Sequence, residues 1–197
     1  MRVLDDSEPR YRLELEMLAR GEAAYRLEFD ALRRRGHLLA DRYRLETTHA
    51  DRPVATEEGW FRDVSVLSWG GDVESYPSDL SPLLGCALML RGLEFERGAE
   101  RSFALWLANT LHWEVGLKVE RRERIEVPAG NFDAWRVRAR PNLHMIAGAL
   151  DRLVAMFLPP FVLHFAADPP HRFLRFAFPT GPFPWNPRGL IEATELD

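Results

Sequence analysis

The tetrapeptide Tyr-Arg-Leu-Glu occurs three times near the start of this 197-residue chain, at residues 11–14, 25–28 and 43–46. Each copy lies in an alternation of apolar and polar residues, such as Tyr11, Leu13 and Leu15 against Arg12 and Glu14. A period of two residues is typical of a β-strand that has one face on a core and the other in water. The three copies therefore predict an antiparallel β-meander over the first quarter of the chain.

The phase of the repeats also predicts the turns that connect them. The tyrosines must face the same side, which requires an odd-length loop and pairs Met17 with Tyr25. Residues 20–22, Arg-Gly-Glu, suit a three-residue loop with the glycine in a left-handed conformation. The turn within residues 33–37 must also be odd unless a β-bulge resets the phase. The outward arginines and glutamates are then expected to form cross-strand ion pairs.

The rest of the chain predicts further strands and two helices. One helix is expected to begin at Ser81-Pro82, with serine as the N-cap, and to end at Gly92. Another is predicted over residues 143–158, where apolar residues recur at helical spacing before Pro159-Pro160. The remaining strands are expected at about residues 59–68, 102–108, 113–121, 124–127, 132–140, 161–166, 172–178 and 190–196.

These elements lack the alternating βαβ rhythm of a parallel sheet. They predict an α+β fold, mainly β, with one large curved antiparallel sheet of about ten strands and two helices packed against it. Such a sheet would form an open or partial barrel. The chain length predicts a single domain over residues 1–197.

Composition excludes several function classes. A net charge of −4 gives no general attraction to nucleic acid. Cys86 is the only cysteine, so no intrachain disulfide can form. The longest apolar stretch, residues 143–163, is interrupted by charges and by Pro159-Pro160, and predicts no transmembrane segment. Residues 1–6 do not resemble a signal peptide, which predicts a cytoplasmic location.

No motif points to catalysis, a metal or a cofactor. The six histidines lack the spacing of a ligand set and are expected to be scattered at the surface or at interfaces. The chain also lacks the motifs of serine hydrolases, phosphate loops and dinucleotide sites. An enzyme would need two ionisable groups converging in a cleft, such as Arg91 with Glu126 or Asp168.

Apolar and aromatic residues give the best candidate for a site. Six Trp and twelve Phe in a curved sheet could line a cavity for a hydrophobic or lipid-like ligand. The same side chains could instead form the core between sheet and helices, and both interpretations stay open. The candidate ligand-binding residues are Trp113, Leu117, Trp135, Val137, Phe176, Trp185 and Arg91.

Several motifs resemble a bacterial family classified as domain of unknown function 3108. They are the helix end at residues 86–92, the hairpin Glu-Arg-Ile-Glu-Val-Pro-Ala-Gly-Asn-Phe-Asp at residues 123–133, and the turn at residues 164–172. The resemblance departs from the family at His164 or Phe165, where members usually carry tryptophan, and in the helix expected at residues 143–158. It implies an open, barrel-like antiparallel sheet and no catalytic residues. Members of the family look exported, unlike this chain.

The sequence therefore favours a non-enzymatic β-rich module that binds a small hydrophobic ligand on its concave face. The alternative is a structural or interaction protein that docks a partner, such as a second copy in a homodimer, through a sheet edge or a helix face. An unidentified enzyme is the third interpretation.

Overall fold

The computed structural model describes residues 2–4, 10–19, 22–34, 37–61, 65–67, 73–75, 77, 79–108, 111–141, 160–180 and 185–196. The chain divides into two compact units. The first comprises Met1–Met89 and Ala104–His112, and the second comprises Leu90–Phe103 and Trp113–Asp197. The assignment of the whole chain to one domain stays a prediction.

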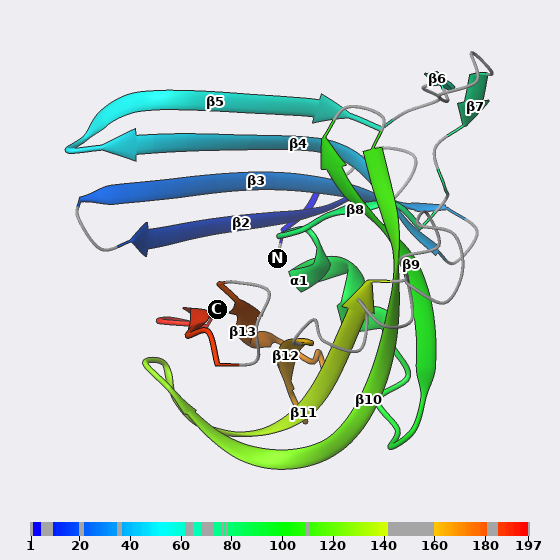
Figure 1. The fold of residues 1–197 in the computed structure, drawn as a ribbon, viewed down its shortest axis with the longest axis vertical. Coiled ribbons are helices and arrows are strands. Elements are labelled where there is room, and N and C mark those ends of the chain that lie inside the picture. Colours follow the sequence, from blue (N-terminus) through cyan, green and yellow to red (C-terminus); the bar gives the residue numbers. More distant parts are fainter. Residues whose placement is uncertain are drawn as a thin grey trace. The chain divides into compact units, whose positions relative to one another are not determined.

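The first unit contains a five-stranded antiparallel sheet in the order β1-β2-β3-β4-β5 (Figure 1). Its strands follow one another in sequence, as a meander requires, and the three tetrapeptide copies lie on β2, β3 and β4. The strand bounds are β1 Arg2–Leu4, β2 Arg10–Ala19, β3 Ala23–Arg34, β4 His37–His49 and β5 Arg52–Trp60. The predicted meander is therefore confirmed.

The register of this sheet confirms the phase argument. Met17 pairs with Tyr25, and Ala19 pairs with Ala23 across a three-residue loop. Within that loop, Glu22 has the left-handed backbone, with φ of 65°; the glycine expected there lies outside the described residues. The next turn has two residues between Arg34 and His37, and a bulge beside Asp41 restores the phase. This is the exception that the sequence allowed.

The two faces of the meander differ in chemistry as predicted. One face supplies Leu27, Phe29 and Tyr43 to a buried core cluster. On the other face, Arg12 Nε donates to Asp30 Oδ1 at 2.7 Å and Arg12 Nη2 to Asp30 Oδ2 at 3.0 Å. Further ion pairs on this face are Arg26–Glu16, Arg42–Glu58, Arg44–Glu58 and Arg44–Glu46.

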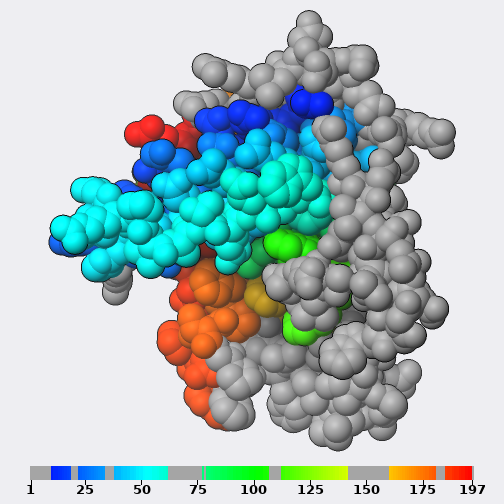
Figure 2. Space-filling view, turned by 90° about the horizontal axis from the view of Figure 1, so that it is seen from above, coloured from blue at the N-terminus to red at the C-terminus, as the bar shows by residue number. Residues whose placement is uncertain are grey.

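Strand β5 corrects the prediction of a strand over residues 59–68. It begins directly after the turn Ala50-Asp51, whose residues have φ of 48° and 58°. Its side chains are exposed along almost the whole strand, and the cyan residues of Figure 2 show them at the surface. An edge strand exposed on both faces needs no apolar alternation, so the periodicity did not reveal it. A separate hairpin follows, made of β6 Ser65–Leu67 and β7 Val73–Ser75.

The helix predicted from Ser81-Pro82 is much shorter than expected. Ser81–Pro82 form β8, which pairs in parallel with β9, Glu100–Ala108. Helix α1 covers only Cys86–Met89, and the 3₁₀ helix η1 follows at Leu90–Gly92. Ser81 does not cap the helix, because α1 begins only at Cys86; the Ser81 hydroxyl donates to the Pro82 carbonyl oxygen at 3.0 Å. The second predicted helix, residues 143–158, lies outside the described residues.

The remaining strands form a seven-stranded sheet in the order β14-β13-β12-β11-β10-β9-β8. Its long strands β10 and β11 curve strongly along their length (Figure 1). The bounds not yet given are β10 Leu111–Val127, β11 Gly130–Pro141, β12 Phe161–Ala166, β13 Phe173–Pro179 and β14 Arg188–Glu192. β10 is one strand where two were predicted, because a bulge between Val119 and Arg121 keeps it paired with β11.

The fold is thus mainly β, with a curled sheet, as expected. The prediction of one large sheet is wrong, because the described strands form two large sheets and one hairpin. They number fourteen, four of them only two or three residues long, against about ten predicted. The predicted turn at residues 127–131 is confirmed: Val127 pairs with Gly130, whose φ is 131°.

Candidate functional site

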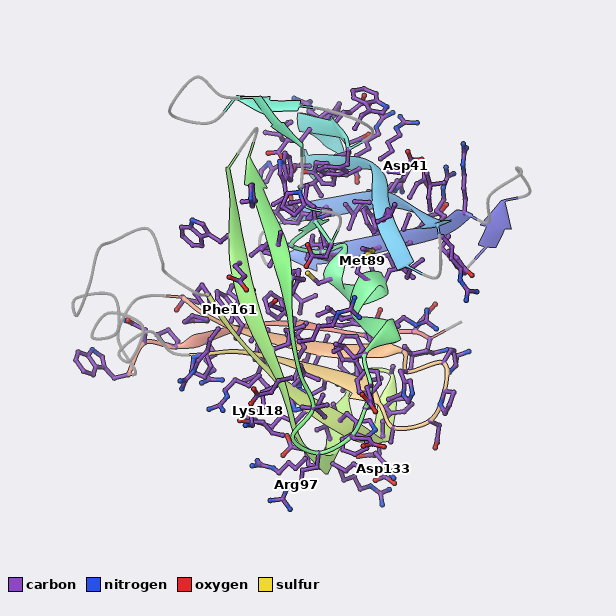
Figure 3. The ribbon with its side chains drawn as sticks, turned by 90° about the vertical axis from the view of Figure 1, so that its right-hand side faces the viewer. Asp41, Met89, Arg97, Lys118, Asp133 and Phe161 are labelled. Atoms are coloured by element: carbon purple, nitrogen blue, oxygen red, sulfur yellow. The ribbon has the colours of Figure 1, made fainter. Side chains whose placement is uncertain are left out.

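A line of ionisable side chains crosses the curled sheet of the second unit from β10 to β14. These residues lie directly opposite one another on adjacent strands, and we call them the charged row: Arg121, Arg136, His164, Arg175 and Glu192. Figure 3 labels Lys118, Asp133 and Phe161 on β10, β11 and β12, three of the strands that carry the row. The row ends on Glu192 in β14, the last strand of the sheet among the described residues.

Two β-bulges align residues in this row. One shifts the register of β10 against β11 between Val119 and Arg121. The other shifts β12 against β13 between His164 and Phe165. Each bulge inserts an additional residue and re-aims the side chains beside it. The first bulge leaves Glu120 as the additional residue, with no residue directly opposite it on β11, and its carboxylate accepts from Arg136.

Every arginine of the row is bonded to a carboxylate. Arg136 Nε donates to Glu120 Oε2 at 2.7 Å, and Arg138 Nε lies 3.1 Å from Glu120 Oε1. Arg121 Nε donates to Glu123 Oε2 at 2.8 Å. Acidic side chains therefore lie beside Arg136 and Arg138 of β11.

Glu123 joins the network to a buried histidine. His164 Nε2 lies 2.8 Å from Glu123 Oε1, and only 4% of His164 is exposed. A carboxylate can only accept, so Nε2 carries the proton, while the buried Nδ1 has no hydrogen-bond partner among the described residues. The expectation of histidines scattered at the surface or at interfaces is wrong for His164. Its neighbours are Arg136 on β11 and Arg175 on β13, and the spacing of histidines along the chain does not show such pairings between distant strands.

Burial controls the protonation of this pair. Burial lowers the pKa of His164 by more than the hydrogen bond to Glu123 raises it, and Arg136 and Arg175 lower it further. Burial raises the pKa of Glu123, but the hydrogen bonds from His164 and Arg121 outweigh this, so that its pKa lies below the usual value. The folded protein therefore holds a neutral imidazole against a carboxylate.

The lowered pKa of His164 predicts a loss of stability in mild acid. The unfolded chain binds a proton at His164 near pH 6.5, where the folded protein still excludes it. The contribution to stability is therefore complete above about pH 6.5 and decreases as the pH falls below it. Urea unfolding between about pH 5 and pH 7.5 measures this slope, in a range above the titration of Glu123. In His164→Gln the slope should become shallower. An unchanged slope would assign the effect to another group.

The edge strand β14 carries the exposed end of the site. Its neighbour is β13, with Glu192 opposite Arg175 and Gly189 opposite Phe178. Arg175 Nε donates to Glu192 Oε1 at 2.6 Å, which holds the carboxylate at the edge. A Cβ atom at Gly189 would lie 2.3 Å from the Phe178 ring, so glycine allows the ring to cover the strand. Leu190, which lies between Gly189 and Glu192 in β14, is 55% exposed.

The predicted ligand-binding residues divide into two groups. Leu117, Val137 and Phe176 are closed to water, with 3%, 0% and 6% of each exposed. Trp113 and Trp185 are exposed. Side chains that line a ligand-sized cavity are accessible to water, so exposures near zero indicate side chains in close contact. A hydrophobic ligand on the first group would have to displace the chain that covers it, and that function stays a prediction.

The other two predicted residues make structural contacts. The Trp135 ring lies beneath the Arg122 guanidinium, 5.5 Å from ring centre to Cζ. Arg91 Nε donates to the carbonyl oxygen of Pro170 at 2.8 Å. Phe95, beside η1, stacks on His171 with ring centres 4.3 Å apart. Arg91 and Phe95 therefore both contact the turn between β12 and β13.

Within the described ranges, no group of three His, Cys, Asp or Glu residues is arranged to hold a metal ion. The described helices include none long and apolar enough to cross a membrane.

No family model, curated protein or solved structure matches this chain. The resemblance to the family of domain 3108 accordingly stays a prediction.

Proposed function

We propose that this protein is a non-enzymatic interaction module that docks an extended polypeptide segment on the edge strand β14. One observation carries the proposal: the charged row ends on Glu192 at a strand that is last in its sheet among the described residues, beside the exposed Leu190. An edge strand presents unpaired backbone groups that an added strand can bond. The site for a partner is therefore a hydrogen-bonding edge with side chains of defined charge.

The side chains of β14 define the chemistry of the segment that fits it. An antiparallel segment centred on Leu190 needs a basic residue opposite Glu192 and an acidic residue opposite Arg188. It also needs an apolar residue opposite Leu190, because that side chain is half in water. Cross-strand pairs of these kinds are each worth a fraction of a kcal/mol, so their pattern provides specificity more than strength.

Catalysis is less well supported by the same residues. His164 is the natural candidate for a base, but it is buried and its protonated nitrogen is bonded to Glu123. A general base must reach the proton that it removes. The carboxylates of Glu120, Glu123 and Glu192 each accept a hydrogen bond from an arginine.

A labelled peptide tests the proposal. The peptide Thr-Lys-Val-Leu-Val-Glu-Thr sets lysine opposite Glu192 and leucine opposite Leu190 when it pairs antiparallel to β14. Its binding should raise fluorescence anisotropy and slow amide hydrogen exchange over residues 188–192. We expect binding at least about tenfold weaker for a matched peptide with glutamate in place of lysine, because two carboxylates then face each other.

The protein also offers a control for the same measurement. Leu190→Asp places a charge at the centre of the edge without disturbing buried residues, and should abolish the protection from exchange. Equal binding of both peptides, or protection that persists in Leu190→Asp, would contradict docking at β14.

A further inference from the structure

We infer that the segment docked on β14 is β14 of a second copy of this chain. The inference rests on the proposed function and names its partner. It follows from the sequence of the strand, Arg188-Gly189-Leu190-Ile191-Glu192, which is complementary to itself when two copies run antiparallel. A two-fold axis through Leu190 would make the contact isologous, so that every pair away from the axis occurs twice.

The charges of the two copies match in this arrangement. With Leu190 opposite its own equivalent, Arg188 of each copy lies opposite Glu192 of the other. Glu192 is already bonded to Arg175, so the second copy's Arg188 would place a second guanidinium group beside the same carboxylate. A carboxylate between two guanidinium groups is well placed, because it can accept from both.

The apolar and glycine positions match as well. The two Leu190 side chains, each 55% exposed, would lie side by side on one face of the joined sheet. Gly189 would lie opposite Ile191 of the second copy, so the larger side chain meets the smallest one. Directly opposite residues of antiparallel strands lie about 4.5–5.5 Å apart at Cα, which brings the leucines into contact.

The edge strand β5 of the five-stranded sheet is not complementary to a second copy of itself. When two β5 strands pair about Thr56, Val54 lies opposite Glu58 and Ala55 opposite Glu57. Pro53 in the same strand cannot donate a backbone hydrogen bond. At the other end of the curled sheet, β8 has two residues and one is Pro82. Charges and proline are the usual means by which edge strands avoid pairing, and β14 has no proline.

Cross-linking tests the register directly in the full-length chain. Opposite Cα atoms at about 4.5–5.5 Å lie within the range of a disulfide, so Leu190→Cys should form a covalent dimer under oxidised glutathione. The matched control is Val54→Cys, because Val54 is 65% exposed and lies on the β5 edge. Native Cys86 contributes little, since it is buried and burial raises its pKa to about 12.

A second substitution distinguishes cross-linking through the specific β14 contact from cross-linking by random encounters between molecules. Adding Arg188→Glu to Leu190→Cys places two carboxylates opposite each other at both ends of the contact, and should slow cross-linking by about tenfold or more. Arg188 is exposed, and circular dichroism would verify that the fold is kept. Sedimentation of the unmodified chain over a series of concentrations should show a reversible dimer that Arg188→Glu weakens by a similar factor.

The outcomes are distinct. Cross-linking at Leu190 only, suppressed by Arg188→Glu, supports the dimer. Equal cross-linking at Val54 and Leu190, or none at Leu190, would overturn it. If the labelled peptide still binds β14 in that case, the proposed function stands and its partner is a different chain. If the peptide also fails, both the function and the dimer are wrong.

Discussion

Replacing Phe165 with alanine is expected to lower the free energy of unfolding by about 3–5 kcal/mol. Phe165 is fully buried in the second unit. Its ring centre lies 5.6 Å from that of Phe95 and 6.0 Å from that of Phe173. Truncation removes these contacts and leaves a void that close-packed neighbours fill only in part. Urea unfolding followed by circular dichroism measures the loss.

Two further variants serve as controls for the effect of Phe165→Ala on the free energy of unfolding. Phe165→Leu keeps most of the buried volume and should cost much less than alanine. Leu18→Ala removes an exposed side chain and should change the free energy by less than about 0.5 kcal/mol. A loss below about 1 kcal/mol for Phe165→Ala would mean that a cavity already adjoins the ring. That result would favour the hydrophobic-ligand function.

Replacing Glu123 with alanine is expected to lower the free energy of unfolding by about 2–4 kcal/mol. The change removes the partner of His164 and of Arg121, and a carboxylate oxygen 3.7 Å from Arg136 Nη1. The His164 side chain would then be buried with neither nitrogen bonded by this network. Leaving a buried polar group unsatisfied costs more than the original bond contributed.

The control for Glu123 lies on the same strand. Glu114 is exposed, so Glu114→Ala should have an effect of less than about 0.5 kcal/mol. The double variant Glu123→Leu with His164→Leu should recover part of the loss, because two apolar groups replace both partners. If Glu123→Ala and Glu114→Ala lower the free energy of unfolding by similar amounts, the hydrogen bond between Glu123 and His164 does not stabilise the fold. That result would contradict the prediction.

Much of the meander could be predicted because its information is local. Alternation assigned a face to each residue of β2, β3 and β4, and the need to keep Tyr25 on the core side specified an odd loop. The same logic expected an odd second turn unless a bulge reset the phase, and the structure has an even turn with a bulge beside Asp41. Strand β5 was not predicted, because Thr56, Glu57 and Glu58 lie at an exposed edge, where no core imposes an alternation of apolar and polar residues.

The candidate site could not be predicted in the same way. The sequence placed arginines and glutamates outward on β10 and β11, but the partners of each depend on two register shifts. A bulge changes which residues face each other while leaving the local composition unremarkable. Nothing near His164 in the chain indicates that Glu123, 41 residues earlier, is bonded to it.

The chain alone was enough to establish the strands of the meander, their faces and the turns at residues 20–22 and 127–131, because these follow from the period of the backbone and from residues next to one another. The three Tyr-Arg-Leu-Glu copies are the clearest example. Long-range pairing specified the rest: which strands share a sheet, where the sheet ends, and how the charged row reaches Glu192 on β14. Register between distant strands is a cooperative property of the packed sheet, so no single segment carries it.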